Sequence, residues 1–441
     1  MDFFTALREI LDMMYMLVIV LIIPIITFVF TVKNNRRNSY RKRVEKFSNM
    51  RKTSAERSHE IRKEIREKGF EGYPYLIHLE KWNHKKGISL LEIDEIQLVA
   101  DDKAYDYRKI KRYIKRKILL PNKHLSIVDN LKKYESGKLY DNPSYGISRI
   151  EDDKDVMIFH VKRNSYFEFV NTCFGYEFEA AYEKMKNSKK FLLRRKYPIM
   201  DFTNRFASFG IVTFVIIRNV LSENGKIDNY CLIHTRSDDV SESKGLVNAV
   251  PGATFQPSNV SAQKELAEAL EIEGIKYTIV REFCEEILGD EMFSELPDSV
   301  LVEKSEAWKM LDGNIYYLGC GINSINAYLE MLTCAVIDMK TDIAKKYFYN
   351  QDDDSAVSKS TNKTKSMLIL PLAAKNSKKC VSKSMVEKMI KANFEGEIEL
   401  KKISKDELKF LEGSVKSTPA LRQICKILIE DYDNISSQLG L

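Results

Sequence analysis

The sequence lacks the cysteine and histidine clusters that bind structural zinc. Its seven cysteines lie far apart without a CxxC pair, and its six histidines are equally scattered. A zinc site is therefore not expected. An odd, scattered set of cysteines fits reduced thiols in a cytosolic domain rather than a disulfide framework.

Charge is absent from residues 13–32, which read MMYMLVIVLIIPIITFVFTV. Twenty apolar residues that rise about 1.5 Å each span about 30 Å, which is the thickness of the hydrocarbon core of a bilayer. The acidic start of the chain and the bulky residues at the end of the run do not fit a cleaved secretory signal. We therefore predict a single transmembrane helix here, with Pro24 tolerated inside it.

Positive charge follows the apolar run at once. Residues 33–68 hold fourteen Lys and Arg against five Glu, a net charge of +9, whereas the whole chain has a net charge of +7. The positive-inside rule then places the bulk of the chain in the cytoplasm, and the basic segment against anionic lipid. Nucleic-acid binding would need this charge on a folded face with aromatic partners, so no nucleic-acid polymer is expected as a partner.

Three regions are expected along the chain. Residues 1–32 form the N-terminal segment and membrane helix, residues 33–110 a basic juxtamembrane and helical linker region, and residues 111–441 an α+β domain with a mixed sheet and flanking helices. Apolar runs at 206–221 and 229–234 predict two strands, and Asn224-Gly225 between them fits a hairpin turn. Further on we expect a polar loop at 349–365 and a strand at 367–372.

The segment 107–117 carries seven cations around an apolar stripe of Tyr107, Ile110 and Ile114. Two interpretations stay open. The helix either lies against a membrane surface or packs its stripe on a small protein core.

The stretch Arg281-Glu-Phe-Cys-Glu-Glu-Ile-Leu-Gly289 carries the strongest chemical signal of the soluble region. On a helix, Glu282, Glu285 and Glu286 share one face. Three carboxylates on one face repel each other unless a cation lies between them, and Mg²⁺ held by carboxylates and phosphate oxygens is the usual occupant. Arg281 is placed to pair back onto one of these glutamates.

This stretch resembles the core of a Nudix box, and Asn248-Ala-Val-Pro-Gly-Ala-Thr-Phe resembles the strand and glycine loop that open one. The resemblance implies a Nudix-like fold, with Gly252 and Arg281 as motif residues and Glu282, Glu285 and Glu286 as metal ligands. The sequence departs from the pattern in three ways. Gly252 lies 29 residues before Arg281, about twice the usual separation; the earlier glutamate would fall at Ser258; and the closing glycine comes one residue late.

A second resemblance covers about residues 110–440 in pieces, and its motifs are Tyr140-Asp-Asn-Pro-Ser-Tyr, Arg163-Asn-Ser-Tyr-Phe-Glu, Val250-Pro-Gly-Ala-Thr-Phe-Gln-Pro, Arg281-Glu-Phe-Cys-Glu-Glu, Tyr317-Leu-Gly-Cys-Gly-Ile-Asn and Thr418-Pro-Ala-Leu-Arg. Taken in this order along the chain, the six motifs resemble those of the Nudix-like domain associated with cGAS/DncV-like nucleotidyltransferases. With the membrane span, the chain is similar to the transmembrane Nudix effectors of bacterial CBASS antiphage defence.

That resemblance implies a receptor-effector at the bacterial inner membrane. Its ligand would be a cyclic di- or trinucleotide, binding would drive homo-oligomerisation, and the membrane helices would breach the membrane and abort infection. By position alone, the nucleotide-contact candidates are Arg218, Arg236, Phe255 and Gln256. No catalytic residue is assigned and no cofactor is required, with Mg²⁺ as a possible one.

Two other interpretations stay open. The chain could be a membrane-tethered, Mg²⁺-dependent Nudix hydrolase of a nucleoside diphosphate derivative, although the missing glutamate and the insertion count against retained hydrolysis. It could also be a structural membrane anchor for a partner complex, which would bind no nucleotide.

Overall fold

A computed structural model gives the architecture of the chain. It describes residues 3–19, 23–69, 74–118, 120–134, 139–153, 156–188, 190–236, 245–290, 293, 297, 299–345, 381–393 and 397–441. The loop expected at 349–365 and the strand expected at 367–372 lie outside these residues.

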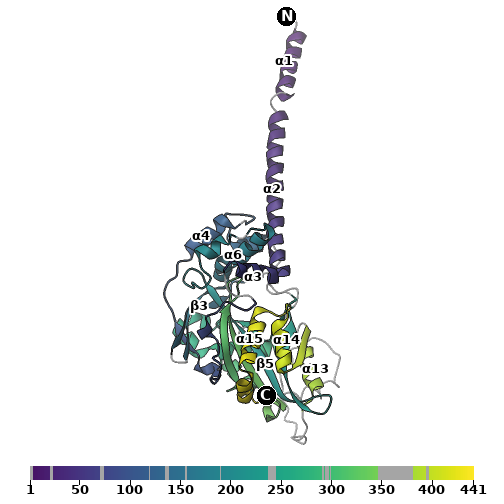
Figure 1. Cartoon of the computed structure of the whole chain (residues 1–441). Coiled ribbons are helices and arrows are strands. Elements are labelled where there is room, and N and C mark those ends of the chain that lie inside the picture. The colour runs from purple at the N-terminus through teal and green to yellow at the C-terminus, as the bar shows by residue number, and fades with distance from the viewer. Residues whose placement is uncertain are drawn as a thin grey trace.

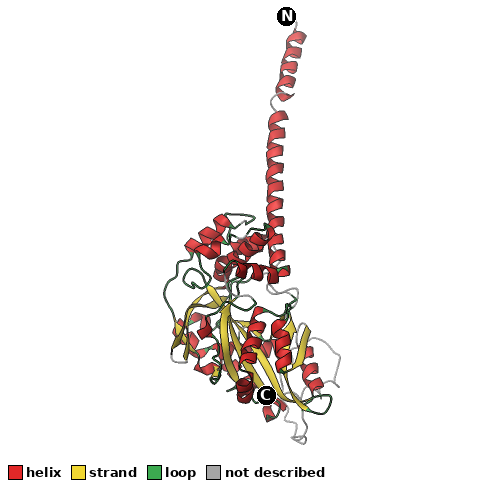
Figure 2. Ribbon diagram, in the orientation of Figure 1, coloured by secondary structure: helices red, strands yellow, loops and turns green. Residues whose placement is uncertain are grey.

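The described helices and strands come in runs along the folded region (Figures 1 and 2). The helices are α1 (Phe3–Leu17), α2 (Ile23–Glu56), α3 (Ser58–Glu67), α4 (Arg108–Lys117), α5 (Ile127–Tyr134), α6 (Tyr166–Met185), α7 (Leu192–Lys196), α8 (Leu266–Ile272), α9 (Ile275–Glu282), α10 (Ser299–Glu303), α11 (Glu306–Leu311), α13 (Lys383–Asn393), α14 (Lys405–Gly413), α15 (Pro419–Glu430) and α16 (Tyr432–Leu439). The strands are β1 (Leu91–Glu92), β2 (Gln97–Ala100), β3 (Pro143–Asp153), β4 (Val156–Ser165), β5 (Ala207–Leu221), β6 (Ile227–Thr235), β7 (Val247–Ala249), β8 (Gly252–Thr254), β9 (Ile315–Ile322), β10 (Leu329–Asp338) and β11 (Glu397–Lys402).

These strands form one large mixed sheet, ordered β1-β9-β10-β5-β3-β4-β2, with β6, β7, β8 and β11 off this path. β5 is its centre. It runs parallel to β10 and antiparallel to β3, β6 and β8. The predicted hairpin is confirmed, because β5 and β6 pair antiparallel and Gly225 in the turn has a φ of +77°. The α+β class and the mixed sheet are confirmed with it.

The core lies on both faces of β5, which explains its nearly continuous apolar run. Alternate side chains point to opposite faces of a strand. Val212, Phe214 and Ile216 pack with α14, α15 and α16, whereas Phe209 and Ile211 pack on the other face with residues of α6 and α9. The strand thus joins two apolar layers.

The region predicted as a linker contributes to this body. Leu91 and Glu92 pair with β9, and residues 97–100 pair with β4. Trp82, Ile93 and Ile96 are buried in the main core. Residues 76–100 therefore pack together with the rest of the sheet.

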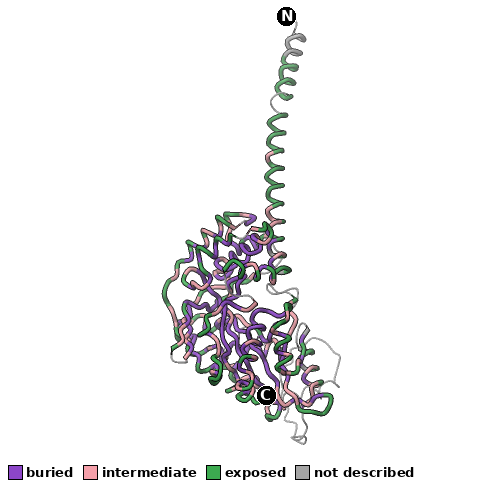
Figure 3. Tube along the Cα trace, viewed as in Figure 1, coloured by how far each residue is buried: buried purple, intermediate pink, exposed green. Residues whose placement is uncertain are grey.

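Helix α1 and the first part of α2 stand away from the folded body (Figure 3). Residues 10–19 and 23–31 are exposed, and the first fully buried side chain of α2 is Phe47, whose ring lies 5.0 Å from that of Phe178. Among the described residues, no helix combines the length and the apolar character needed to cross a membrane. The predicted span includes residues 20–22, which lie outside that description.

Candidate functional site

The motif at residues 281–289 begins in an α-helix and continues into a wider, π-helical turn. Arg281 and Glu282 close α9, and residues 283–287 form a π-helical turn, with the Leu288 N–H donating to the Phe283 carbonyl at 3.1 Å. A π turn holds one residue more than an α turn. It therefore accommodates the glycine that comes one residue late, and Gly289 ends the turn with a φ of +66°.

Arg281 organises two of the three motif glutamates. Its side chain is 2% exposed, pairs with Glu282, and reaches Glu285 at 3.2 Å. It also donates to the Phe293 carbonyl at 3.4 Å. The expectation that Arg281 pairs back onto the motif is confirmed, and this buried guanidinium holds the acidic face in place.

Glu286 is directed to the glycine loop. The Gly252 N–H donates to its Oε2 at 3.2 Å. Burial, and next the neighbouring carboxylate of Glu282, raise the pKa of Glu286 well above its usual range. Burial raises the pKa of Glu282 as well, against the opposing effect of Arg281. The pair therefore favours a proton or a cation over two bare charges.

The expectation that Glu282, Glu285 and Glu286 bind a metal stays a prediction. Among the described residues, no group of three Asp, Glu, His or Cys side chains is arranged to hold a metal ion. Glu285 is 34% exposed and is engaged by Arg281. Glu282 and Glu286 remain as the two carboxylates that could hold Mg²⁺, because this ion commonly takes one or two carboxylates together with phosphate oxygens and water.

A fourth glutamate, Glu273, precedes the motif. Counted back from Arg281 with the usual box spacing, the earlier glutamate falls at Glu273, eight residues before it. Its side chain is buried and accepts the Ser258 N–H at 2.8 Å. Glu273 therefore has the box spacing to Arg281, but it lies farther from Gly252 than the box pattern has it. A count forward from Gly252 reaches Ser258 and not Glu273.

A cleft opens beside Gly252, where the glycine loop, the centre of the sheet and the start of α15 meet. It encloses about 800 Å³, its open mouth included. Its walls combine apolar, aromatic and polar side chains, and it is lined by Tyr166, Phe169, Gly210, Ile211, Val212, Arg236, Asn248, Gly252, Ala253, Thr254, Asn323, Tyr328, Glu330, Thr418, Pro419 and Ala420.

Tyr328 forms the aromatic wall of the cleft. Its hydroxyl lies 3.1 Å from that of Thr254, and its ring lies 5.3 Å from that of Phe169. Gly210 leaves the space for this ring, because a Cβ there would lie 2.4 Å from the Tyr328 Cε1. An aromatic ring held in this way offers a stacking surface for a flat ligand.

Other lining residues of the cleft suit an anion. Thr418 caps α15 by accepting the Leu421 N–H at 3.2 Å, and its hydroxyl donates to Asn248 at 2.6 Å. The positive end of the α15 dipole therefore faces the cleft. Arg236, at the end of β6, lines the same cleft and lowers the pKa of Glu286 by its charge.

The four nucleotide-contact candidates fall in different places. Arg236 lines the cleft. Arg218 lies at the far end of β5, where it pairs with Asp338 at 2.9 Å and donates to the Leu439 carbonyl at 2.8 Å. Phe255 is fully buried, with its ring 4.6 Å from that of Tyr145, and Gln256 is half-buried beside it. Of the four, only Arg236 is among the side chains that line the cleft.

Pieces of the sequence resemblance that lie far apart in the chain contact one another, and two of the residues concerned, Asn248 and Thr418, line the cleft. Tyr145 packs on Phe255, and the Arg163 guanidinium donates to the Ser261 carbonyl at 3.3 Å. Thr418 bonds to Asn248, the first residue of the piece that contains the glycine loop. From the sequence, Thr418 was predictable only as part of a motif. Tyr328 was not predictable, because an isolated aromatic residue in a loop carries no local signal.

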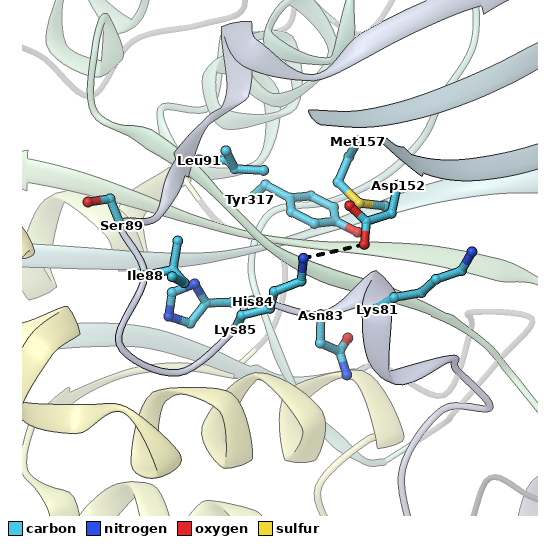
Figure 4. Close-up of a pocket in the computed structure, with 10 residues that line it drawn as sticks. All are labelled: Lys81, Asn83, His84, Lys85, Ile88, Ser89, Leu91, Asp152, Met157 and Tyr317. Carbon is cyan, nitrogen blue, oxygen red and sulfur yellow. Dashed lines mark ion pairs between the residues drawn. The ribbon is translucent and has the colours of Figure 1, made fainter. Parts of the chain in front are cut away.

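A second, smaller hollow of about 400 Å³ lies between β9 and the loop after residue 80 (Figure 4). Lys85 reaches across it to Asp152 at 3.4 Å. The His84 ring in its wall is already bonded to the buried Asp431 at 2.9 Å. The box residues lie elsewhere, so the larger cleft is the candidate site.

Comparisons with known proteins give a distant structural match. No family model and no curated protein matches the chain. Among solved structures, the chain is similar to the NUDIX hydrolase from Alicyclobacillus acidocaldarius, at 13% sequence identity over 30% of this chain and 69% of that chain, with a TM-score of 0.18.

Proposed function

We propose that this chain is a membrane-anchored receptor for a cyclic di- or trinucleotide. The observation that carries the proposal is the cleft beside Gly252. It combines an aromatic wall at Tyr328, the cation of Arg236 and the N-terminal end of α15. Bases need stacking partners, and phosphates need cations or backbone N–H groups.

Ligand binding in this proposal acts through association of chains. One apolar helix cannot line a pore, so membrane damage requires several chains, and a ligand drives assembly only if it binds the assembled form more tightly. The exposed apolar residues of α1 and the start of α2 support an anchor, because surfaces of this kind in a folded protein mark interaction sites. The outcome would be disruption of the bacterial inner membrane and abortive infection.

Dye-filled vesicles containing the full chain test this proposal. One cyclic di- or trinucleotide should release the dye and increase the oligomer size, whereas the linear nucleotides of the same bases should do neither. Arg236→Ala should weaken the response, and Arg218→Ala, which removes an arginine outside the cleft, should leave it close to that of the unmodified chain. Release by no cyclic species would contradict the proposal.

A membrane-tethered Nudix hydrolase is the second candidate, favoured by the recovered Glu273 and by the intact Arg281 network. In that case Glu282 and Glu286 would hold Mg²⁺ together with diphosphate oxygens of the substrate. Mg²⁺-dependent release of a nucleoside monophosphate, lost in Glu286→Gln, would identify this activity. Release that does not depend on Mg²⁺ or on Glu286 would rule it out.

A further inference from the structure

Helix α4 turns its apolar stripe inward and its charge outward. Ile110 and Ile114 are buried, and a Cβ at Gly175 of α6 would lie 2.6 Å from the Ile114 Cδ1. Of the two interpretations of this segment, packing on the protein core is therefore confirmed. The outer side presents five exposed cations, namely Arg108, Lys109, Arg112, Arg116 and Lys117.

Few of these cations are neutralised by the protein. Arg108 pairs with Asp106 at 2.8 Å, and the half-buried Lys111 pairs with Glu168 at 2.9 Å. Within the part of the chain that the structure describes, no acidic side chain pairs with Lys109, Arg112, Arg116 or Lys117. We name these four residues the α4 face. A concentration of unpaired like charge is a surface that suits an anionic partner.

Helix α4, which carries the α4 face, lies at the end of the folded body from which α2 rises (Figure 1). The ring of Tyr40 on α2 meets that of Tyr134, at the end of α5, at a distance of 5.6 Å. The described residues 33–42 of α2 are all exposed, and Arg43 is the first of the half-buried residues that follow. Ten helical residues rise about 15 Å, so the body begins about 15 Å from the end of the apolar run.

This distance brings the α4 face close to a bilayer surface. The headgroup layer on each side of a bilayer is about 5–8 Å thick, so it fills part of the 15 Å. The remaining gap is comparable to the Debye length of about 8 Å at physiological ionic strength, and long Lys and Arg side chains shorten it. At about one Debye length, the attraction between the α4 charges and anionic headgroups is reduced by salt but still acts.

We infer that the α4 face docks on the anionic phospholipid surface of the membrane that holds the chain. The inference rests on the proposed membrane anchor and adds a second contact to it. A single helix leaves the body free to rotate about α2, whereas helix and docked face together fix one orientation of the cleft relative to the bilayer.

Lysine reactivity in lipid nanodiscs tests the inference on the full chain. Discs of phosphatidylcholine are compared with discs in which about a third of the lipid is phosphatidylglycerol. Acetylation of Lys109 and Lys117 should fall several-fold in the anionic discs and recover at about 0.5 M salt, where the Debye length is only about 4 Å. The exposed Lys388 and Lys391 on α13 should react equally in both kinds of disc.

A charge variant with a matched control completes the test. A fluorophore at His124→Cys, an exposed position between α4 and α5, reports energy transfer to labelled headgroups. Replacing the four residues of the α4 face by Gln should reduce transfer in anionic discs to its value in neutral discs. The control replaces four exposed lysines on α13 and α14, namely Lys388, Lys391, Lys405 and Lys409, and should leave transfer unchanged.

Equal reactivity of Lys109 and Lys117 in both kinds of disc overturns the inference while leaving the anchor in place. Protection of these lysines in neutral discs by a short RNA, without an effect of phosphatidylglycerol, also overturns it and reassigns the face to nucleic acid. A chain that does not enter discs at all overturns the inference and the proposed anchor together.

Discussion

At the residue scale, the site depends on two acidic side chains held close together. Glu282 and Glu286 both have raised pKa values, chiefly because burial penalises their charged forms. Such a pair lowers stability when both groups are ionised and binds a proton or cation readily. The same property suits a phosphate-bound Mg²⁺.

Replacing Glu286 by Gln should stabilise the protein at alkaline pH. A carboxyl with a raised folded-state pKa binds more protons in the folded than in the unfolded state, so its contribution to stability falls as the pH rises above its unfolded-state pKa of about 4.5. Glutamine keeps an acceptor for the Gly252 N–H but carries no charge. We expect Glu286→Gln to match the unmodified chain near pH 4.5 and to exceed it at pH 8 by about 1–3 kcal/mol in urea unfolding. A uniform loss of stability across this pH range would contradict the proposed repulsion.

Gly210 should be intolerant of even one added methyl group. Alanine there would drive a Cβ to 2.4 Å from the Tyr328 ring, so the ring must leave its place in the cleft. Overpacking of this kind costs about 1–3 kcal/mol. Gly252→Ala is the matched control in the same cleft, because nothing lies within 4 Å of its added Cβ. Urea unfolding should show a loss for the first variant of at least about twice that of the second; equal losses would contradict the role of Tyr328.

At the element scale, the start of α15 connects helix capping to the cleft. Thr418→Ala removes the cap of Leu421 and the bond to Asn248, which should cost about 1–2 kcal/mol. Ser404→Ala removes the equivalent cap of α14, where Ser404 accepts the Glu407 N–H at 3.1 Å. Denaturation should show comparable losses for the two variants. Only Thr418→Ala should also weaken nucleotide binding measured by calorimetry, and weakening by both would show that the effect is not local.

Elements with a local signal were predictable from the sequence, and those set by tertiary contacts were not. The apolar run of β5 and the Asn224-Gly225 turn specify a hairpin by themselves, and it forms as expected. The π turn after Glu282 was not predictable, because its extra residue looks like a misplaced glycine in one dimension. Glu273 was missed because the insertion shifts its distance from Gly252 but not from Arg281.

Tertiary contacts also decide which of the nucleotide-contact candidates lie at the cleft. Arg218 and Arg236 both follow apolar strand residues, and nothing in the sequence separates them. The sheet does so, because Arg218 lies beside Asp338 at one end of β5 and Arg236 lies at the glycine-loop end of β6. Phe255 was a candidate by position alone, and the structure buries it against Tyr145.

At the scale of the whole molecule, the N-terminal rod and the folded body are separable. Residues 10–19 and 23–31 are exposed, so the body draws no packing from them. A chain without residues 1–32 should keep the Tm of the full chain within about 1 °C, because burial is unchanged. It should also stay in solution without detergent and lose its association with vesicles in a flotation assay. Retained flotation would contradict the anchor, and a large fall in Tm would contradict the separation.

The Tm of the full chain shows whether the cleft binds a cyclic nucleotide. It is measured with cyclic di- and trinucleotides and, for comparison, with linear nucleotides. A ligand that binds only the folded state, present at 100 times its Kd, stabilises it by about 2.7 kcal/mol, which raises the Tm by several degrees. We expect such a rise in Tm with one cyclic species and none with the linear nucleotides of the same bases. In Arg236→Ala the rise in Tm should be smaller. No rise with any cyclic species, or a rise that Arg236→Ala leaves intact, would contradict binding of a cyclic nucleotide in the cleft.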